Sequence, residues 1–434
     1  MPSSAVAVPS RSYAVERATL GNGLRVLFAP DRSAPVVAVA VYYDVGIRSE
    51  PEGRTGFAHL FEHLMFQGSA SLQKMEHVTY VQSSGGTLNG STRLDYTNYY
   101  EALPSHALER ALFLEADRMR APRVTEENLA NQIAVVKEEI RVNVLNEPYG
   151  GFPWLTLPPV LFDTFPNAHN GYGGFEDLES ATVQDAQDFF DRYYAPGNAV
   201  LAVGGDLDPA EALRLVERHF GDIPARDVPP RPDFDEPVPR AERRAEQVDL
   251  LAPAPAVALG WRVPDPADLP AYLPYVLLTS ALTTGDASRL RRRLVHADRL
   301  VTDIGSHVGL LEDPFDVRNP TLLVLEAHHA ADVATDRVVG AVDEELDRLA
   351  IEGLHAGELE RVRARLGSAL VQGQDHVMGR TLSMTALEQQ RGDPALVGEL
   401  PALLATVDAE AVRLAASTLR PDSRARVDLV TGAP

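Results

Sequence analysis

The chain contains no cysteine among its 434 residues. Disulfide bonds, thiolate metal ligands and a cysteine nucleophile are therefore excluded, so a bound metal would have to take nitrogen and oxygen ligands. No apolar run reaches the roughly 18 residues that a membrane-spanning helix needs. Residues 1–11 also lack the basic segment and the sustained apolar segment of a secretory leader. We therefore expect no contact with a membrane and a cytoplasmic location.

Positive charge is also scarce, because 40 Lys and Arg stand against 62 Asp and Glu, which gives a net charge of −22. Contacts with nucleic-acid phosphates need clustered basic side chains. The densest basic cluster, residues 289–293, is typical of a solvated helix face. We therefore expect no nucleic-acid partner. A hydrophobic content of 45% in a chain of this length indicates a globular protein with two or more domains.

Two histidines flank a glutamate in the run His59-Leu60-Phe61-Glu62-His63. Residues four apart lie about one turn apart on an α-helix, so both imidazoles could reach one ion. Apolar residues spaced three or four apart around this run predict such a helix. Two histidines packed on an ordinary amphipathic helix are the alternative. The glutamate in this order favours a metal site, because H-x-x-E-H is the motif of inverted zinc peptidases.

The candidate for a third ligand lies in residues 125–143, whose apolar residues predict a helix with one buried face. On this helix Glu138 would point away from the buried face, whereas Glu139 would lie on its flank near Gln132. Glu139 is therefore the better ligand. The apolar residues of the buried face are Leu129, Ile133, Val136 and Ile140.

With these residues in view, the chain resembles the pitrilysin and mitochondrial processing peptidase family of zinc endopeptidases. Glu139 follows His63 by 76 residues, which is close to the spacing in that family. Residues 175–178 and 189–196 also look like the family. A further series with the family's pattern consists of Gly85, Gly86, Asn89, Thr92, Asp95, Thr97 and Tyr99.

The resemblance implies a peptide substrate and one Zn²⁺ held by His59, His63 and Glu139. Zinc lowers the pKa of a bound water and polarises a carbonyl group, and Glu62 would be the general base that takes the proton of the water. Many relatives have a glutamate at the position of Gln132, where it orients a ligand histidine. An amide can keep that hydrogen bond but not the charge, so we expect Gln132 to tune zinc affinity.

Residues 85–92 look like a strand that is entered through a flexible glycine pair. The resemblance implies that it is an edge strand, to which a peptide adds by backbone hydrogen bonds. An ordinary sheet strand with an incidental asparagine is the alternative. With the resemblance, we expect Asn89 and Gly90 to bind the substrate.

Six prolines among charged residues at 223–239 predict a linker. Similar apolar runs lie on either side of it, at 34–41 and 254–261, and this offset of 220 residues indicates a duplicated domain. We predict an N-terminal catalytic zinc-binding domain (1–222), a proline-rich linker (223–245) and a homologous C-terminal domain (246–434). The expected fold class is α+β, in which each half is an antiparallel sheet with helices packed on it, like half of a clam shell.

The second copy offers no metal ligands near its counterpart of the histidine helix, around Val276, Thr279 and Ser280. Self-sufficient relatives also supply an Arg and a Tyr from their C-terminal half. Here those positions are Val295 and Thr302, which carry neither a guanidinium nor a phenol, although Arg289 is a nearby candidate substitute.

We therefore expect a heterodimer with a homologous partner that lacks H-x-x-E-H and supplies the Arg/Tyr pair. Two alternatives stay open: a structural or assembly subunit of the same fold without proteolysis, and a metal hydrolase acting on something other than peptides. Of the remaining residues, Trp154 is predicted to lie in the core and His169 in a surface loop.

Overall fold

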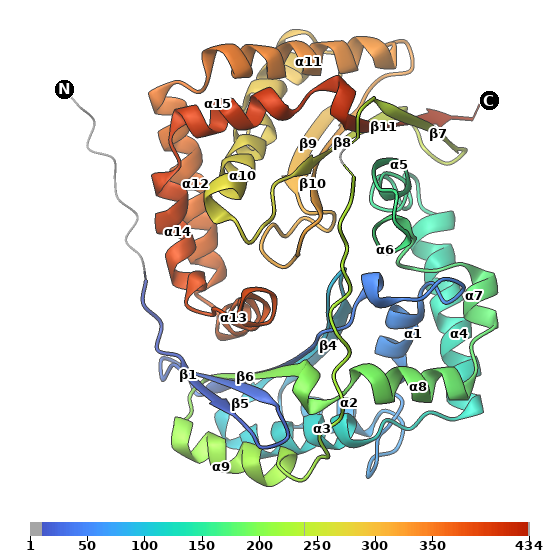
Figure 1. Cartoon of the computed structure of the whole chain (residues 1–434), viewed down its shortest axis with the longest axis vertical. Coiled ribbons are helices and arrows are strands. Elements are labelled where there is room, and N and C mark those ends of the chain that lie inside the picture. Colours follow the sequence, from blue (N-terminus) through green and yellow to red (C-terminus); the bar gives the residue numbers. More distant parts are fainter. Residues whose placement is uncertain (1–10, 238, 433–434) are drawn as a thin grey trace.

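The computed structural model describes residues 11–237 and 239–432 as two halves stacked on each other (Figure 1). The residues that the leader prediction concerns lie, apart from Arg11, outside that part of the chain. Among the described residues, no helix is both long enough and apolar enough to cross a membrane.

The first half is built on a six-stranded sheet with the order β1-β2-β6-β3-β5-β4. Every neighbouring pair is antiparallel except β2 and β6, which run parallel. Strand β4 therefore lies at an edge, with β5 as its partner. The strands are β1 (Glu16–Thr19), β2 (Arg25–Pro30), β3 (Val36–Tyr43), β4 (Thr87–Thr92), β5 (Thr97–Pro104) and β6 (Ala199–Gly205).

The apolar residues of β3 alternate onto both faces of this sheet, so both faces must be covered. Helices of the first half cover one of them. Val39 and Val41 belong to the same core as Leu60 and Phe61 of the histidine helix. The helices of this half are α1 (Phe57–Leu64), α2 (Glu76–Ser83), α3 (Leu108–Arg120), α4 (Glu126–Ile140), α5 (Pro158–Leu161), α6 (Phe165–Ala168), α7 (Phe175–Glu179), α8 (Val183–Tyr193) and α9 (Pro209–Phe220).

The second half repeats this plan, because its sheet has the order β7-β11-β8-β10-β9 with β7 and β11 parallel. Strand β8 begins and ends 220 residues after β3, as the predicted duplication requires. The strands are β7 (Arg243–Asp249), β8 (Ala256–Val263), β9 (Asp303–Val308), β10 (Thr321–His328) and β11 (Arg424–Thr431). The helices are α10 (Leu269–Thr283), α11 (Thr335–Glu352), α12 (Ala356–Gly373), α13 (Val377–Arg391), α14 (Leu396–Thr406) and α15 (Ala409–Thr418).

The predicted fold class is confirmed: the chain has two α+β halves of the same topology. The sheets are antiparallel except for one parallel pair each. Parallel neighbours need a long crossover connection, and here β6 and β11 are the last strands of their halves. They return to the sheet after several helices and enter beside β2 and β7.

Residues 223–237 and 239–242 contain neither helix nor strand, and they cross from the first half to the second (Figure 1). The domain boundaries at 222 and 246 stay predictions. The halves are also joined by packing, since α13 of the second half lies against β3 and β6 of the first. Buried Arg48 and Asp95 extend this contact, because the Arg48 guanidinium donates to Arg318 O and the Arg318 N–H donates to Asp95.

Candidate active site

Helices α1 and α4 bring His59, His63 and Glu139 together. The Nε2 atoms of the two histidines lie 3.3 Å apart, and the Glu139 oxygens lie 3.7 Å from His59 and 3.4 Å from His63. Ligands placed about 2.0–2.2 Å from a tetrahedral zinc are roughly 3.3–3.5 Å from one another. The two imidazole nitrogens and the Glu139 carboxylate, whose Oε1 is nearer His59 and whose Oε2 is nearer His63, therefore lie close enough to hold one zinc ion. They form a nitrogen–nitrogen–oxygen set of the kind found in catalytic sites.

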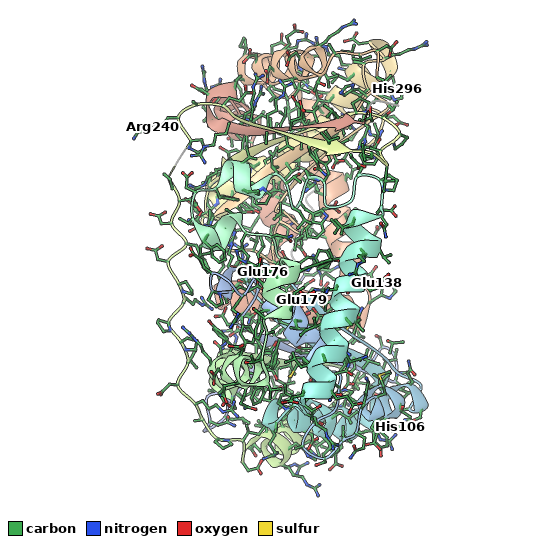
Figure 2. All side chains as sticks on the ribbon, turned by 90° about the vertical axis from the view of Figure 1, so that its right-hand side faces the viewer. His106, Glu138, Glu176, Glu179, Arg240 and His296 are labelled. Atoms are coloured by element: carbon green, nitrogen blue, oxygen red, sulfur yellow. The ribbon has the colours of Figure 1, made fainter. Side chains whose placement is uncertain are left out.

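The phase of helix α4 decides which carboxylate reaches the histidines. The helix begins after Thr125, whose hydroxyl accepts a hydrogen bond from the Asn128 N–H, and its buried face includes Val136. Glu139 then faces α1. Glu138 lies on the outer face of the helix (Figure 2), where the Arg141 guanidinium donates to it at 3.0 Å.

Burial shifts the pKa values of the first histidine and of Glu62. Burial and the neighbouring His63 lower the pKa of His59 to about 4, so this imidazole is neutral near pH 7, as a metal ligand must be. Burial raises the pKa of Glu62. A carboxylate with a raised pKa is better matched to proton transfer near neutral pH.

Glu62 lies beside the three donors without joining them. The Thr92 hydroxyl donates to its Oε2 at 2.6 Å. Gly90 approaches it so closely that a Cβ atom at that position would lie 3.1 Å from Glu62 Oε1 and 3.2 Å from the Phe66 ring. The carboxylate is therefore held by β4 on one side and by its own helix on the other.

The two histidines have different surroundings behind the donor atoms. Gln132 is buried beside His63. Burial alone would lower the pKa of this histidine, but the hydrogen bond to Glu139 and the charges of Glu62 and Glu139 raise it overall, and Gln132 adds to this effect. His59 Nδ1 is buried and has no hydrogen-bond partner among the described residues. The structure thus places Gln132 where the sequence analysis expects it, and its effect on zinc affinity stays a prediction.

Two residues that the sequence analysis missed hold the start of α1. Glu50 accepts hydrogen bonds from the Gly56 N–H at 2.9 Å and the Ala58 N–H at 2.7 Å. His169 lies 3.0 Å from the same carboxylate, and its side chain is only 5% exposed. His169 does lie in a loop, as predicted, but its side chain is buried and not on the surface. Its partner is 119 residues away in the sequence, so no local pattern could reveal the pair.

Replacing Glu50 with alanine should destabilise the protein by about 3–5 kcal/mol, because it breaks a buried ion pair and leaves two helix N–H groups without acceptors. Urea unfolding at pH 7 measures this change. Glu52→Ala, at an exposed position two residues away, is the control and should change the free energy of unfolding by less than about 0.5 kcal/mol. Equal stability of the two variants would contradict the capping role of Glu50.

A cavity of about 300 Å³ opens in front of the donors. It is lined by His59 and Glu62 of α1, by Gly90 of β4, and by Trp154 and Tyr172, among others. The prediction that Trp154 is a core residue is wrong: it is half-buried, and the neighbouring Phe152 takes the core position. Their apolar run is too short for a periodicity that would tell the two residues apart.

The predicted substrate strand is β4, and it lies at the edge of the sheet as expected. Asn89 is exposed, and its Oδ1 accepts a hydrogen bond from the Gly90 N–H at 2.9 Å. Gly90 lines the cavity whereas Asn89 does not. Binding of substrate by these two residues stays a prediction.

The second half does not supply the missing donors. Val295 packs against the core of that half, and the Thr302 hydroxyl donates to His328 O. Arg289 is wrong as a substitute, because it is buried and held by the carboxylates of Glu345 and Glu358. Its guanidinium serves the packing of the second half.

Two duplicated α+β halves, one of which carries an H-x-x-E-H helix and a distant glutamate, define the class of inverted-motif metallopeptidases. The chain belongs to peptidase family M16. Residues 25–148 match the family described as Insulinase (Peptidase family M16), and residues 180–366 match its Peptidase M16 inactive domain.

Relatives and solved structures agree with this assignment. The chain is 31% identical to the zinc protease PqqE of Helicobacter pylori over 69% of this chain and 67% of that protein. A crystal structure of a protease from Helicobacter pylori has a TM-score of 0.88 at 24% identity and covers 96% of this chain and 100% of its own. The periplasmic protease PqqL of Escherichia coli matches 98% of this chain with only 48% of its own, at a TM-score of 0.78 and 18% identity. This chain thus corresponds in fold to about half of the length of that structure.

Proposed function

We propose that this chain is the zinc-bearing subunit of an endopeptidase. The observation that carries the proposal is the donor set of His59, His63 and Glu139, whose mutual distances suit one tetrahedral zinc ion with Glu62 beside it. When bound, zinc would polarise the scissile carbonyl and make water a better acid. The relatives named zinc proteases support this choice of metal.

Within this site Glu62 takes a proton from the attacking water and passes it to the leaving amine. The Thr92 hydroxyl keeps one carboxylate oxygen in place, so the other oxygen, next to Gly90, is free to accept the proton. The peptide adds to the free edge of β4, where Asn89 and Gly90 contact its backbone. Backbone pairing of this kind places the scissile bond without selecting particular side chains.

A homologous partner subunit completes the enzyme in this proposal. Two features support it: Val295 and Thr302 cannot act as the Arg/Tyr pair, and PqqL carries about twice the length that this chain matches. The partner would lack H-x-x-E-H and enclose the cavity with a second pair of halves. A cytoplasmic location stays a proposal as well.

The direct test compares the purified chain, alone and together with the homologous subunit isolated from the same cells, on a mixture of peptides analysed by mass spectrometry. The complex should cleave internal bonds, whereas the chain alone should show less than about 1% of that rate, as expected when transition-state donors are missing. A chelator should stop cleavage, and added zinc should restore it.

Each arm of this experiment can contradict one part of the proposal. A full rate from the chain alone would rule out the need for a partner. Cleavage that survives complete removal of the metal would rule out zinc. Chelator-sensitive hydrolysis of non-peptide esters without cleavage of any peptide would favour a metal hydrolase of another class.

A further inference from the structure

Tyr172 is carried on a loop that is locked onto the beginning of the metal helix. Gly173 has φ +84° and Gly56 has φ +80°, a backbone conformation that favours glycine. A Cβ atom on Gly173 would overlap Thr55 O, and one on Gly56 would overlap Tyr172 O. The two segments therefore touch backbone to backbone, and the sequence permits this only because both positions are glycine.

Polar contacts fasten the loop on both sides of Tyr172. Before it, His169 is paired with Glu50, the same carboxylate that caps α1. After it, the Gly174 N–H donates to the Thr55 hydroxyl at 3.0 Å. The position of Tyr172 is thus set by the segment that leads into the helix with both histidines.

The Tyr172 side chain reaches into the site itself. Its ring lies edge-on to the His59 imidazole, with centroids 5.1 Å apart, and 5.2 Å from the Trp154 ring. Its hydroxyl donates to Glu139 Oε1 at 3.1 Å. The residue is half-buried and lines the same cavity as His59 and Glu62.

The hydroxyl groups of this cavity all donate hydrogen bonds, but to different partners. The Thr92 hydroxyl donates to Glu62 at 2.6 Å, and the Ser91 hydroxyl donates to Asn98 at 2.6 Å. The Tyr172 hydroxyl alone among these three bonds to an oxygen of the donor set. It is therefore the neutral donor best placed to meet a second oxygen close to the metal ligands.

We propose that Tyr172 is a catalytic residue, whose phenol donates a hydrogen bond to the scissile carbonyl oxygen as that oxygen gains negative charge. This inference rests on the proposed endopeptidase function. It would provide within this chain the phenol that is missing at Thr302. The partner subunit would then need to supply only the guanidinium and the opposite wall of the chamber.

The step balances without transfer of the phenol proton. Water bonds to the carbonyl carbon while Glu62 takes one of its protons, and the π electrons of the carbonyl move onto its oxygen. The Tyr172 hydroxyl turns from Glu139 to this oxygen and stabilises the charge. When the carbonyl re-forms, the C–N bond breaks and the proton passes from Glu62 to the amine nitrogen.

Tyr172→Phe tests the proposal in whichever preparation cleaves peptides, with a quenched fluorescent peptide selected from a random library as substrate. The variant keeps the ring that packs on His59 and Trp154, and its melting temperature shows whether the fold is intact. We expect kcat/KM to fall about 10²–10³-fold, as for loss of one oxyanion donor. Tyr80→Phe, at an exposed position on α2, is the matched control and should keep the wild-type rate.

Binding measurements separate this role from a purely structural one. The phosphonamidate analogue of the same peptide, which carries a tetrahedral anionic group, should bind Tyr172→Phe more weakly by about the factor lost in kcat/KM. The affinity for the intact peptide is measured in chains that carry Glu62→Gln, so that no cleavage occurs. With and without the additional Tyr172→Phe change, this affinity should agree within about threefold, since ground-state contacts are kept. Zinc affinity, measured by competition with a chromophoric chelator, should also change by less than about threefold, well below the 10–100-fold expected for loss of a ligand-orienting contact.

Two results would overturn the inference while leaving the proposed function intact. One is cleavage by Tyr172→Phe at the wild-type rate. The other is a drop in zinc affinity of tenfold or more with the rate restored by saturating zinc, which would show that the hydroxyl only holds Glu139. Failure of the proposed function would show differently, because the wild type itself would then cleave no peptide.

Discussion

Glu62→Gln is expected to abolish peptide cleavage while leaving zinc bound. Glutamine has the same shape and can still accept the hydrogen bond from Thr92, but its amide cannot take a proton from water. General-base catalysis typically contributes about 10²–10⁴-fold, so kcat should fall by at least about 10²-fold. The rate is measured with the complex at saturating peptide, and the metal content by elemental analysis.

Glu138→Gln is the matched control for this change, because Glu138 is exposed on α4 and contacts Arg141 rather than the site. It should keep both the rate and the metal. A Glu62→Gln variant that still cleaves peptides at a substantial rate would remove Glu62 from the role of base. A variant that loses its zinc would assign Glu62 to the ligands instead.

Glu139→Ala is expected to remove the metal itself. The carboxylate is the one donor that α4 contributes, and without it the two histidines of α1 are left as a two-ligand site. Catalytic zinc usually requires three protein ligands, so dialysis against a weak chelator should leave close to one zinc per wild-type chain and almost none per variant chain. Cleavage should be lost in parallel.

The neighbouring variant Glu138→Ala has the same loss of charge on the same helix and should keep its zinc. This comparison also tests the alternative of an assembly subunit without proteolysis, which has no need of a metal. If the wild-type chain, purified with zinc present, contains none, and Glu139→Ala assembles with the same partners, that alternative would replace the peptidase proposal.

The residues of the donor set could be singled out from local geometry, whereas the expectation that they meet came from the family resemblance. The spacing of His59 and His63 determines that they share one helix face, and the phase of the apolar positions on α4 distinguishes Glu139 from Glu138. The fold was equally accessible, because the apolar runs that became β3 and β8 repeat at a constant offset. Each of these patterns spans at most one element or one repeat.

The surroundings of the site could not be predicted in the same way. Glu50 and His169, or Tyr172 and Glu139, meet only after the chain has folded, from positions 119 and 33 residues apart. Such pairs leave no periodicity in a single sequence. Arg289 was equally hard to place, because its basic cluster does not show that Glu345 and Glu358 approach it from two other helices.

The packing of α13 on the first sheet determines how a substrate can enter. Helix α13 of the second half covers one face of the first sheet. Arg48 and Asp95 of the first half also bind the 318–320 loop of the second. The two halves therefore cannot swing apart about a hinge without breaking their shared core. The two halves must therefore move together as one rigid unit. In the proposed complex, a polypeptide would then reach the cavity through motion between this chain and its partner subunit.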